Sequence, residues 1–296
     1  MNKILFTAFA IGIFCAGPIV LPALSAETAR PASPNPSPSA RSPSAPAPSA
    51  TTPAHPPQPA APAYDEQAEA EYQHCLKLAT TRPDDGYEEA LAWGSMGGGE
   101  AALHCGAIAR IGQKQYADGA KRLEKLSRES HRPDAIRAQM LAQAAQAWVL
   151  DGNYDQANTD QVAALAIDPN NADIRVDHAV TLGQVHHYKE ALAELDKVLQ
   201  TQSYRLDALI LRASAHRYLD DRKAAMDDVE RALSFDPNNP DALVERGILR
   251  RLNGDDKGAR ADWLAVIKAV PSGPIFDEAQ RNLQLLDDPG ETKPAK

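Results

Sequence analysis

Two His-Cys dipeptides are the residues of this chain whose types best suit metal or redox chemistry. They are His74-Cys75 and His104-Cys105, 30 residues apart. Two thiols and two imidazoles could bind zinc, form a disulfide, or stay as buried free thiols. Adjacent helical residues point about 100° apart, so His74 and Cys75 cannot easily share one metal. The favoured interpretation is a Cys75–Cys105 disulfide, with no metal.

Arginine and aspartate recur at fixed spacings in the second half of the chain. Arg212 and Arg246 are each followed 16 residues later by an aspartate, Asp228 and Asp262. The arginines could bind a ligand. The favoured interpretation is structural, because a column of acids at the same spacing faces them, and it predicts the ion pairs Arg212–Asp228 and Arg246–Asp262. The column comprises Asp160, Glu194, Asp228 and Asp262.

Other candidate sites find no support in the sequence. His186-His187 with Glu190 lacks the His-Glu-x-x-His pattern of a zinc site. There is no Gly-x-Ser-x-Gly, Walker or dinucleotide-binding motif, and the Gly97–Gly99 run follows no strand that could support a phosphate cradle. A net charge of −9 disfavours a nucleic-acid partner. We therefore predict neither catalysis nor a cofactor.

A 34-residue period organises residues 138–273. Columns of like residues recur at this spacing, and Asp168-Pro169-Asn170-Asn171 returns two periods later as Asp236-Pro237-Asn238-Asn239. Such a period is typical of stacked helix pairs. The columns are Ala157, Ala191, Ala225 and Ala259; Ala145, Ala179, Ala213 and Gly247; Leu165, Leu199, Leu233 and Ile267; and Pro169, Ser203, Pro237 and Pro271.

At these columns the chain resembles the tetratricopeptide repeat (TPR) family, in repeats 138–171, 172–205, 206–239 and 240–273. The family has small residues at repeat positions 8 and 20, glycine at 15, an aromatic at 17 and proline at 32. His186 and Asp220 depart from the glycine, and Arg222 and Asp256 from the aromatic. The resemblance implies an all-α, right-handed α-solenoid of antiparallel helix pairs, each pair consisting of a helix A and a helix B.

The resemblance also implies a concave groove lined by the A helices. Arg217 and Arg251, both at position 12, could hold a peptide carboxylate there, or could instead complement the C-terminal dipoles of helices. The family's lysine–asparagine carboxylate clamp is absent, because position 5 holds Val176, Ile210 and Val244. The expected groove residues are Gln146, Gln184, Ser214, Arg217, Tyr218 and Arg251.

The rest of the chain divides by composition. Residues 1–26 resemble a signal peptide, and residues 27–63, with 12 prolines, predict a disordered linker. An uncleaved anchor is the alternative to cleavage. Residues 64–137 predict degenerate helix pairs, which would bring Cys75 and Cys105 together on neighbouring A helices. Residues 274–288 predict a C-terminal capping helix, and 289–296 a disordered tail.

Together these features predict an exported scaffold, periplasmic or secreted, that binds a protein or peptide partner. No membrane insertion is expected after signal cleavage. The sequence leaves open the identity of the partner and the oligomeric state. The alternatives are a cell-envelope enzyme or enzyme accessory subunit, and a structural spacer in an envelope assembly. An enzyme would need convergent acid and base groups in a pocket.

Overall fold

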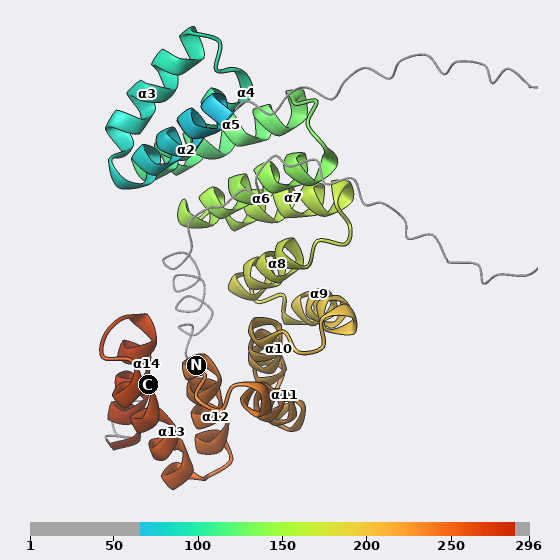
Figure 1. Cartoon of the computed structure of the whole chain (residues 1–296). Coiled ribbons are helices and arrows are strands. Elements are labelled where there is room, and N and C mark those ends of the chain that lie inside the picture. Colours follow the sequence, from blue (N-terminus) through green and yellow to red (C-terminus); the bar gives the residue numbers. More distant parts are fainter. Residues whose placement is uncertain (1–65, 288–296) are drawn as a thin grey trace, which may run out of the picture. The chain divides into compact units, whose positions relative to one another are not determined.

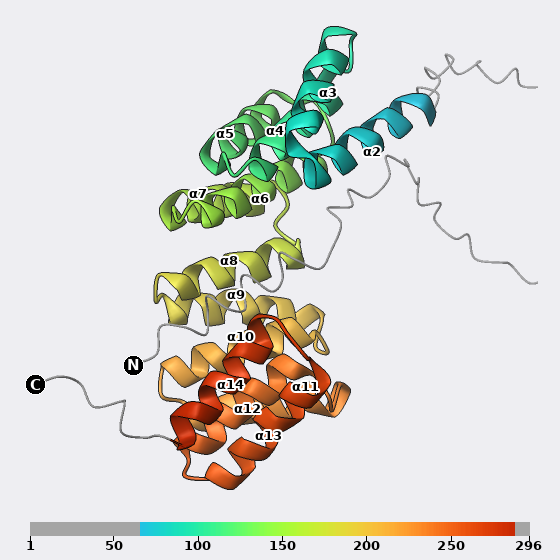
Figure 2. The same cartoon turned by 90° about the vertical axis from the view of Figure 1, so that its left-hand side faces the viewer.

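The computed structural model describes residues 66–287, and within that range its regular elements are all helices (Figure 1 and Figure 2). The expected signal peptide, linker and tail lie outside the described residues. The helices are α2 (Glu66–Thr81), α3 (Pro83–Ser95), α4 (Gly99–Gly112), α5 (Tyr116–Glu129), α6 (Asp134–Leu150), α7 (Tyr154–Ile167), α8 (Ala172–Gln184), α9 (Tyr188–Thr201), α10 (Leu206–Tyr218), α11 (Arg222–Phe235), α12 (Pro240–Leu252), α13 (Asp256–Ala269) and α14 (Pro274–Asp287).

The helices from α3 onward pack in chain order, each against the next, as an all-α solenoid of helix pairs. Helix α10 also contacts α8 and α12, and α12 contacts α14, so the first helices of successive pairs are neighbours. We call α6, α8, α10, α12 and the final α14 the A helices, and α7, α9, α11 and α13 the B helices. The alanine column on the B helices is fully buried, which lets the backbones approach closely: Ala157, Ala191, Ala225 and Ala259.

Asparagine explains why the Asp-Pro-Asn-Asn motif recurs. The Oδ1 atoms of Asn171 and Asn239 accept from the backbone N–H groups of Ile174 and Ala242, at 3.1 and 3.0 Å. Each asparagine therefore caps the first turn of an A helix and satisfies a donor that the helix itself leaves unpaired. The motif marks the starts of α8 and α12.

The turn from helix A to helix B requires a left-handed residue in every repeat. Gly152 and Gly254 take φ values of 78° and 84°, and His186 and Asp220 take 65° and 63° at the same repeat position. The departures from glycine noted in the sequence thus keep the turn geometry, at a steric cost that glycine avoids.

In the last repeat, glycine at position 247 leaves room for a large side chain on the facing helix. A Cβ atom on Gly247 would lie 2.3 Å from Nε1 of Trp263, whose side chain is fully buried. Alanine fills the equivalent position in the earlier repeats, where no tryptophan opposes it. Helix α14 then covers α12 and α13, with Ala279 fully buried and Ile275, Leu283 and Leu286 partly buried against the same core.

Candidate functional site

The two expected arginine–aspartate pairs form as forks between the A and B helices of one repeat. Arg212 donates to both carboxylate oxygens of Asp228, at 2.8 and 2.6 Å, and Arg246 does the same to Asp262, at 3.0 and 2.7 Å. Both aspartates are buried. Arg250 adds a second guanidinium to Asp262 at 2.7 Å. These arginines stabilise the repeats, and hydrogen bonding to Asp228 raises the pKa of Arg212.

The other two acids of the column find different partners. Glu194 pairs with Arg175 of α8 and with Lys197. Asp160 pairs with no arginine among residues 66–287, and Ala144 occupies the position equivalent to Arg212. Burial and the neighbouring Glu124 carboxyl, which accepts from Nε1 of Trp148 at 2.7 Å, raise the pKa of Asp160 to about 7.

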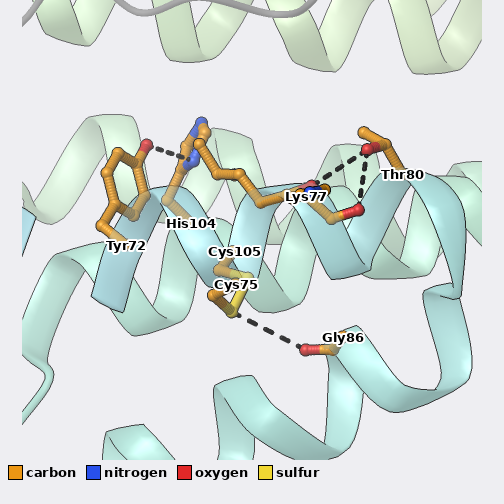
Figure 3. Close-up of a disulfide and its surroundings, with 8 residues drawn as sticks. Tyr72, Cys75, Lys77, Thr80, Gly86, His104 and Cys105 are labelled. Atoms are coloured by element: carbon orange, nitrogen blue, oxygen red, sulfur yellow. Dashed lines mark hydrogen bonds between the residues drawn. A yellow bond between two sulfur atoms is a disulfide. The ribbon is translucent and has the colours of Figure 1, made fainter. Parts of the chain in front are cut away.

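Cys75 of α2 and Cys105 of α4 form a disulfide, with their Cα atoms 6.1 Å apart (Figure 3). The histidines that precede the two cysteines differ in burial: His74 is exposed, and His104 is buried. The ring of His104 is buried, and its nitrogens bond Tyr72 Oη at 2.9 Å and Gln143 Oε1 at 2.7 Å. Burial lowers the pKa of His104, so its ring is neutral at pH 7.

Arg217, expected in a peptide-binding groove, is engaged within the chain. Its guanidinium donates to both oxygens of Glu245 on α12, at 2.6 and 3.3 Å, and Glu245 is fully buried. The guanidinium also lies 4.5 Å from the ring centre of Tyr218. A two-pronged contact of this kind fixes one A helix against the next. An alanine at Arg217 would leave a buried carboxylate uncompensated, so it would not be a neutral probe of binding.

The other expected groove residues also contact neighbouring helices. Arg251 donates to the carbonyl of Leu285, in the last turn of α14, at 2.8 Å. Gln146 donates to Asp177 of α8 at 3.0 Å. Ser214 is buried and offers little accessible surface.

Tyr218 stacks on an aromatic residue of the preceding repeat. Its ring lies parallel to that of Tyr188, with centroids 4.6 Å apart. Tyr188 Oη in turn bonds Nδ1 of the exposed His186 at 2.7 Å. Gln184 is half-buried at the end of α8, one turn before Tyr188 begins α9. Tyr188 and Tyr218 therefore lie where two successive repeats meet.

Sequence reasoning missed the acidic partners on the A helices. Glu245 and Asp177 both occupy repeat position 6, one repeat after the polar residue that each contacts, at separations of 28 and 31 residues. These values fall two turns and one turn short of the 34-residue period. The sequence signal for these contacts is an acid at position 6 of one repeat, together with a polar residue at position 9 or 12 of the repeat before it.

Along one side of the A helices the carboxyls outnumber the cations. We call this side the A-helix face and define it by Asp177, Arg217, Asp241, Glu245, Arg251 and Glu278. Burial raises the pKa of Asp177 to about 6 and that of Glu278 to about 7. The pKa of Glu278 is further raised by the nearby Glu245, and burial raises the pKa of Asp241. The face can therefore attract positive charge once these carboxyls ionise.

Two other kinds of site are absent from residues 66–287. No group of three or more histidine, cysteine, aspartate or glutamate side chains in this range could hold a metal ion. None of the helices described is long and apolar enough to cross a membrane.

Comparison with known proteins points to one repeat family. Residues 206–239, the third repeat of the sequence period, match the family model described as tetratricopeptide repeat. A DnaJ homolog subfamily C member 7 homolog of Schizosaccharomyces pombe is 34% identical over 145 residues, which is 47% of this chain and 30% of that protein. The chain thus spans less than a third of that relative's length.

Solved structures share the fold at low sequence identity. TTC0263, a TPR protein of Thermus thermophilus, superimposes with a TM-score of 0.51 at 14% identity, over 63% of this chain and 98% of that one. MamA from Desulfovibrio magneticus RS-1 gives 0.50 at 20% identity, over 58% and 95%. The family match identifies residues 206–239 as a tetratricopeptide repeat, and the solved structures show that the solenoid around it shares their fold.

Proposed function

We propose that the helix pairs form a scaffold that binds a protein or peptide partner along the A-helix face. The observation that carries the proposal is the continuity of this face, because α8, α10, α12 and α14 contact one another in series. A stack of repeats presents such an extended surface without needing a pocket. TPR proteins in general mediate protein–protein interactions, and the repeat at 206–239 supports the analogy.

We also propose that the chain is exported, to the periplasm or the cell exterior. The support is the apolar N-terminal stretch at 4–20, followed by the small residues Ala23, Ser25 and Ala26. The Cys75–Cys105 disulfide is consistent with an oxidising compartment. Mass spectrometry of the protein recovered from cell fractions tests this. Cleavage after Ser25 or Ala26 supports export, and a cytosolic chain starting at Met1 contradicts it.

Site-specific crosslinking tests the scaffold. A photo-crosslinking amino acid replaces Asp173, whose side chain is 82% exposed on α8, and in a matched variant it replaces Lys223, 88% exposed on α11. We expect one reproducible partner from position 173 and none from position 223. Capture from position 223 alone, or equal capture from both, would contradict binding along the A-helix face.

A further inference from the structure

In the third repeat, an arginine of helix A joins the acids of two successive B helices. Arg212 of α10 donates to Asp196 of α9 at 2.7 Å and to both carboxylate oxygens of Asp228 of α11. One guanidinium thus serves two carboxylates, which lie 16 residues away from it in either direction. Because Asp196 and Asp228 belong to different helix pairs, this arrangement connects one repeat to the next.

Where the repeats begin, the acid of this arrangement is kept and the arginine is missing. Asp160 of α7 lies two 34-residue periods before Asp228, and it is buried like Asp228. Ala144 of α6 lies two periods before Arg212. The position that supplies a guanidinium in the third repeat therefore supplies only a methyl group here.

The second acid of the arrangement is also present, as Glu124 of α5. Glu124 precedes Asp196 by two 34-residue periods and four residues. The same four extra residues separate Tyr116 from Tyr154, the aromatic residues that begin α5 and α7. Glu124 is therefore the equivalent of Asp196. It forms with Asp160 an acid pair that connects two helix pairs without the arginine.

The two carboxyls contact each other between α5 and α7. The Glu124 carboxyl lies within hydrogen-bonding reach of the Asp160 carboxyl, and Nε1 of Trp148 on α6 donates to Glu124 at 2.7 Å. Asp160 is 4% exposed, and its Oδ2 atom has no hydrogen-bond partner within residues 66–287. Its other oxygen, Oδ1, accepts from Nε2 of Gln156 at 3.4 Å. Two buried carboxylates repel each other, so a proton is the donor that this contact requires.

No cation of α5 replaces the missing arginine. Lys121 and Arg128 lie one turn before and one turn after Glu124, and both side chains are exposed. Within the described residues, neither of them forms an ion pair with Glu124 or Asp160. The Lys121 ammonium lies instead over the ring of Trp148, with Nζ 5.9 Å from the ring centroid.

The helices on either side of α7 also leave the contact without a cation. Helix α6 carries no charged residue after Arg137, in its first turn. On α8, Arg175 is paired with Glu194 of α9, and the ring of His178 bonds Asn158 of α7 at 2.9 Å. Burial lowers the pKa of His178, so this ring is neutral at pH 7.

We propose that Glu124 and Asp160 form a proton-dependent joint between the helices α2–α5, which contain the Cys75–Cys105 disulfide, and the repeats that begin at α6. With the proton in place, Oδ2 of Asp160 donates to Glu124 and the two helix pairs pack closely. When the proton leaves for the solvent, two carboxylates face each other without a counter-charge, and α5 separates more readily from α6 and α7. The joint lies outside the A-helix face, so this inference goes beyond the proposed scaffold function and can fail separately from it.

Hydrogen exchange of the full chain, read by mass spectrometry at pH 5.5 and pH 8.5, tests the joint. The rates are corrected for the intrinsic effect of pH on amide exchange, so that only the opening of the helices remains. Up to a pH of about 7, the closed joint holds a proton that an opened, solvated Asp160 has lost. Opening is therefore favoured as the pH rises, and we expect the amides of α5–α7 to open about tenfold more often at pH 8.5 than at pH 5.5.

Two amide variants separate the joint from other pH-dependent parts of the chain. Asp160→Asn and Glu124→Gln each remove one of the two charges, and the new amide can donate to the remaining carboxylate. In each variant the opening of α5–α7 should differ by less than about twofold between the two pH values. Exchange in α10–α14 should match that of the unsubstituted chain at each pH. As a matched control, Asp228→Asn removes the equivalent acid where Arg212 is present, and it should speed exchange in α10 and α11 at both pH values.

The outcomes decide the proposal. The amides are close in shape to the protonated acids, and circular dichroism at pH 5.5 checks that each variant is folded. Loss of the pH dependence in both single variants supports a proton shared by Glu124 and Asp160. A pH dependence that persists in either variant, or an unsubstituted chain whose α5–α7 helices open equally at both pH values, would overturn the joint.

Discussion

The two ends of the solenoid hold polar side chains between packed helices in different ways. In α10–α13, each buried acid of the repeating column faces an arginine fork, at Asp228 and Asp262. In α2–α7, Asp160 faces another carboxyl, and the amide nitrogen of the buried Gln143 has no partner within the described residues. That end instead has the Cys75–Cys105 disulfide.

This difference shows that the period of a repeat does not by itself determine how a repeat is stabilised. An acid recurs at position 23 throughout, but it forms an ion pair across the helix pair only where helix A supplies an arginine. Because each repeat contacts mainly its neighbours, the two ends should respond separately to substitutions. The A-helix face lies on α8–α14 and should therefore be independent of the disulfide.

The largest effect is expected in the fork region. Asp262→Asn removes the charge that Arg246 and Arg250 share; the partly buried Arg246 loses its paired carboxylate, and Arg250 keeps only the more distant Asp255, at 3.9 Å. We expect a loss of about 3 kcal/mol in the free energy of unfolding, measured by urea denaturation. The control Asp227→Asn, at an exposed pair with Lys223, should lose less than about 0.5 kcal/mol. A loss below about 1 kcal/mol at Asp262 would contradict a stabilising role for the fork.

An aspartate-to-asparagine substitution at the other end, at Asp160, should raise the free energy of unfolding instead of lowering it. Asp160 has a pKa of about 7 in the folded chain and ionises near 3.8 when unfolded. The folded state therefore holds a proton that the unfolded state has lost, and stability falls as the pH rises from about 4 through 7. Asp160→Asn should stabilise by about 1 kcal/mol at pH 8, allowing for solvent screening, and have no such effect at pH 4. Urea denaturation at both pH values checks this, and a destabilised variant at pH 8 would refute the carboxyl pairing.

The smallest effect concerns the turns, which the two ends share. Asp220→Gly relieves a left-handed aspartate and gives up only an exposed pair with Arg222. We expect a gain of about 0.5–1 kcal/mol in the free energy of unfolding. Gly254→Ala, at the equivalent turn, should lose a similar amount. Thermal unfolding of both variants measures the difference, and a shift in the same direction for both would argue against backbone strain as the cause.

Much of the fold could be predicted because its causes repeat. The alanine columns, the asparagine caps and the two arginine forks each follow from residues that recur every 34 positions or a multiple of that period. A pattern that recurs several times can be recognised in a single sequence. Where the arginine is missing, as at Ala144 and His178, the sequence shows its absence but does not reveal that the Glu124 carboxyl lies beside Asp160 instead.

The candidate site was less predictable because its residues contact one another across repeats. The sequence allows Arg217 to hold a peptide carboxylate or to complement a helix dipole, whereas its guanidinium donates to Glu245, and Gln146 donates to Asp177. The family resemblance indicates which helix side a position occupies. It does not reveal whether a long side chain contacts a bound protein or a residue of the adjacent helix. The unpaired acids, such as Glu278 beyond the last repeat, carry no repeat signal at all.

Hydrogen exchange of the disulfide-free chain tests most directly whether the two ends are held independently. Cys75→Ala with Cys105→Ala removes a closure of about 30 residues, worth about 3.6 kcal/mol in the chain-entropy model. Independent ends predict amide exchange up to about 400-fold faster in α2–α5, with unchanged exchange in α8–α14. Equal acceleration in α8–α14 would contradict this independence, because the A-helix face would then depend on the disulfide.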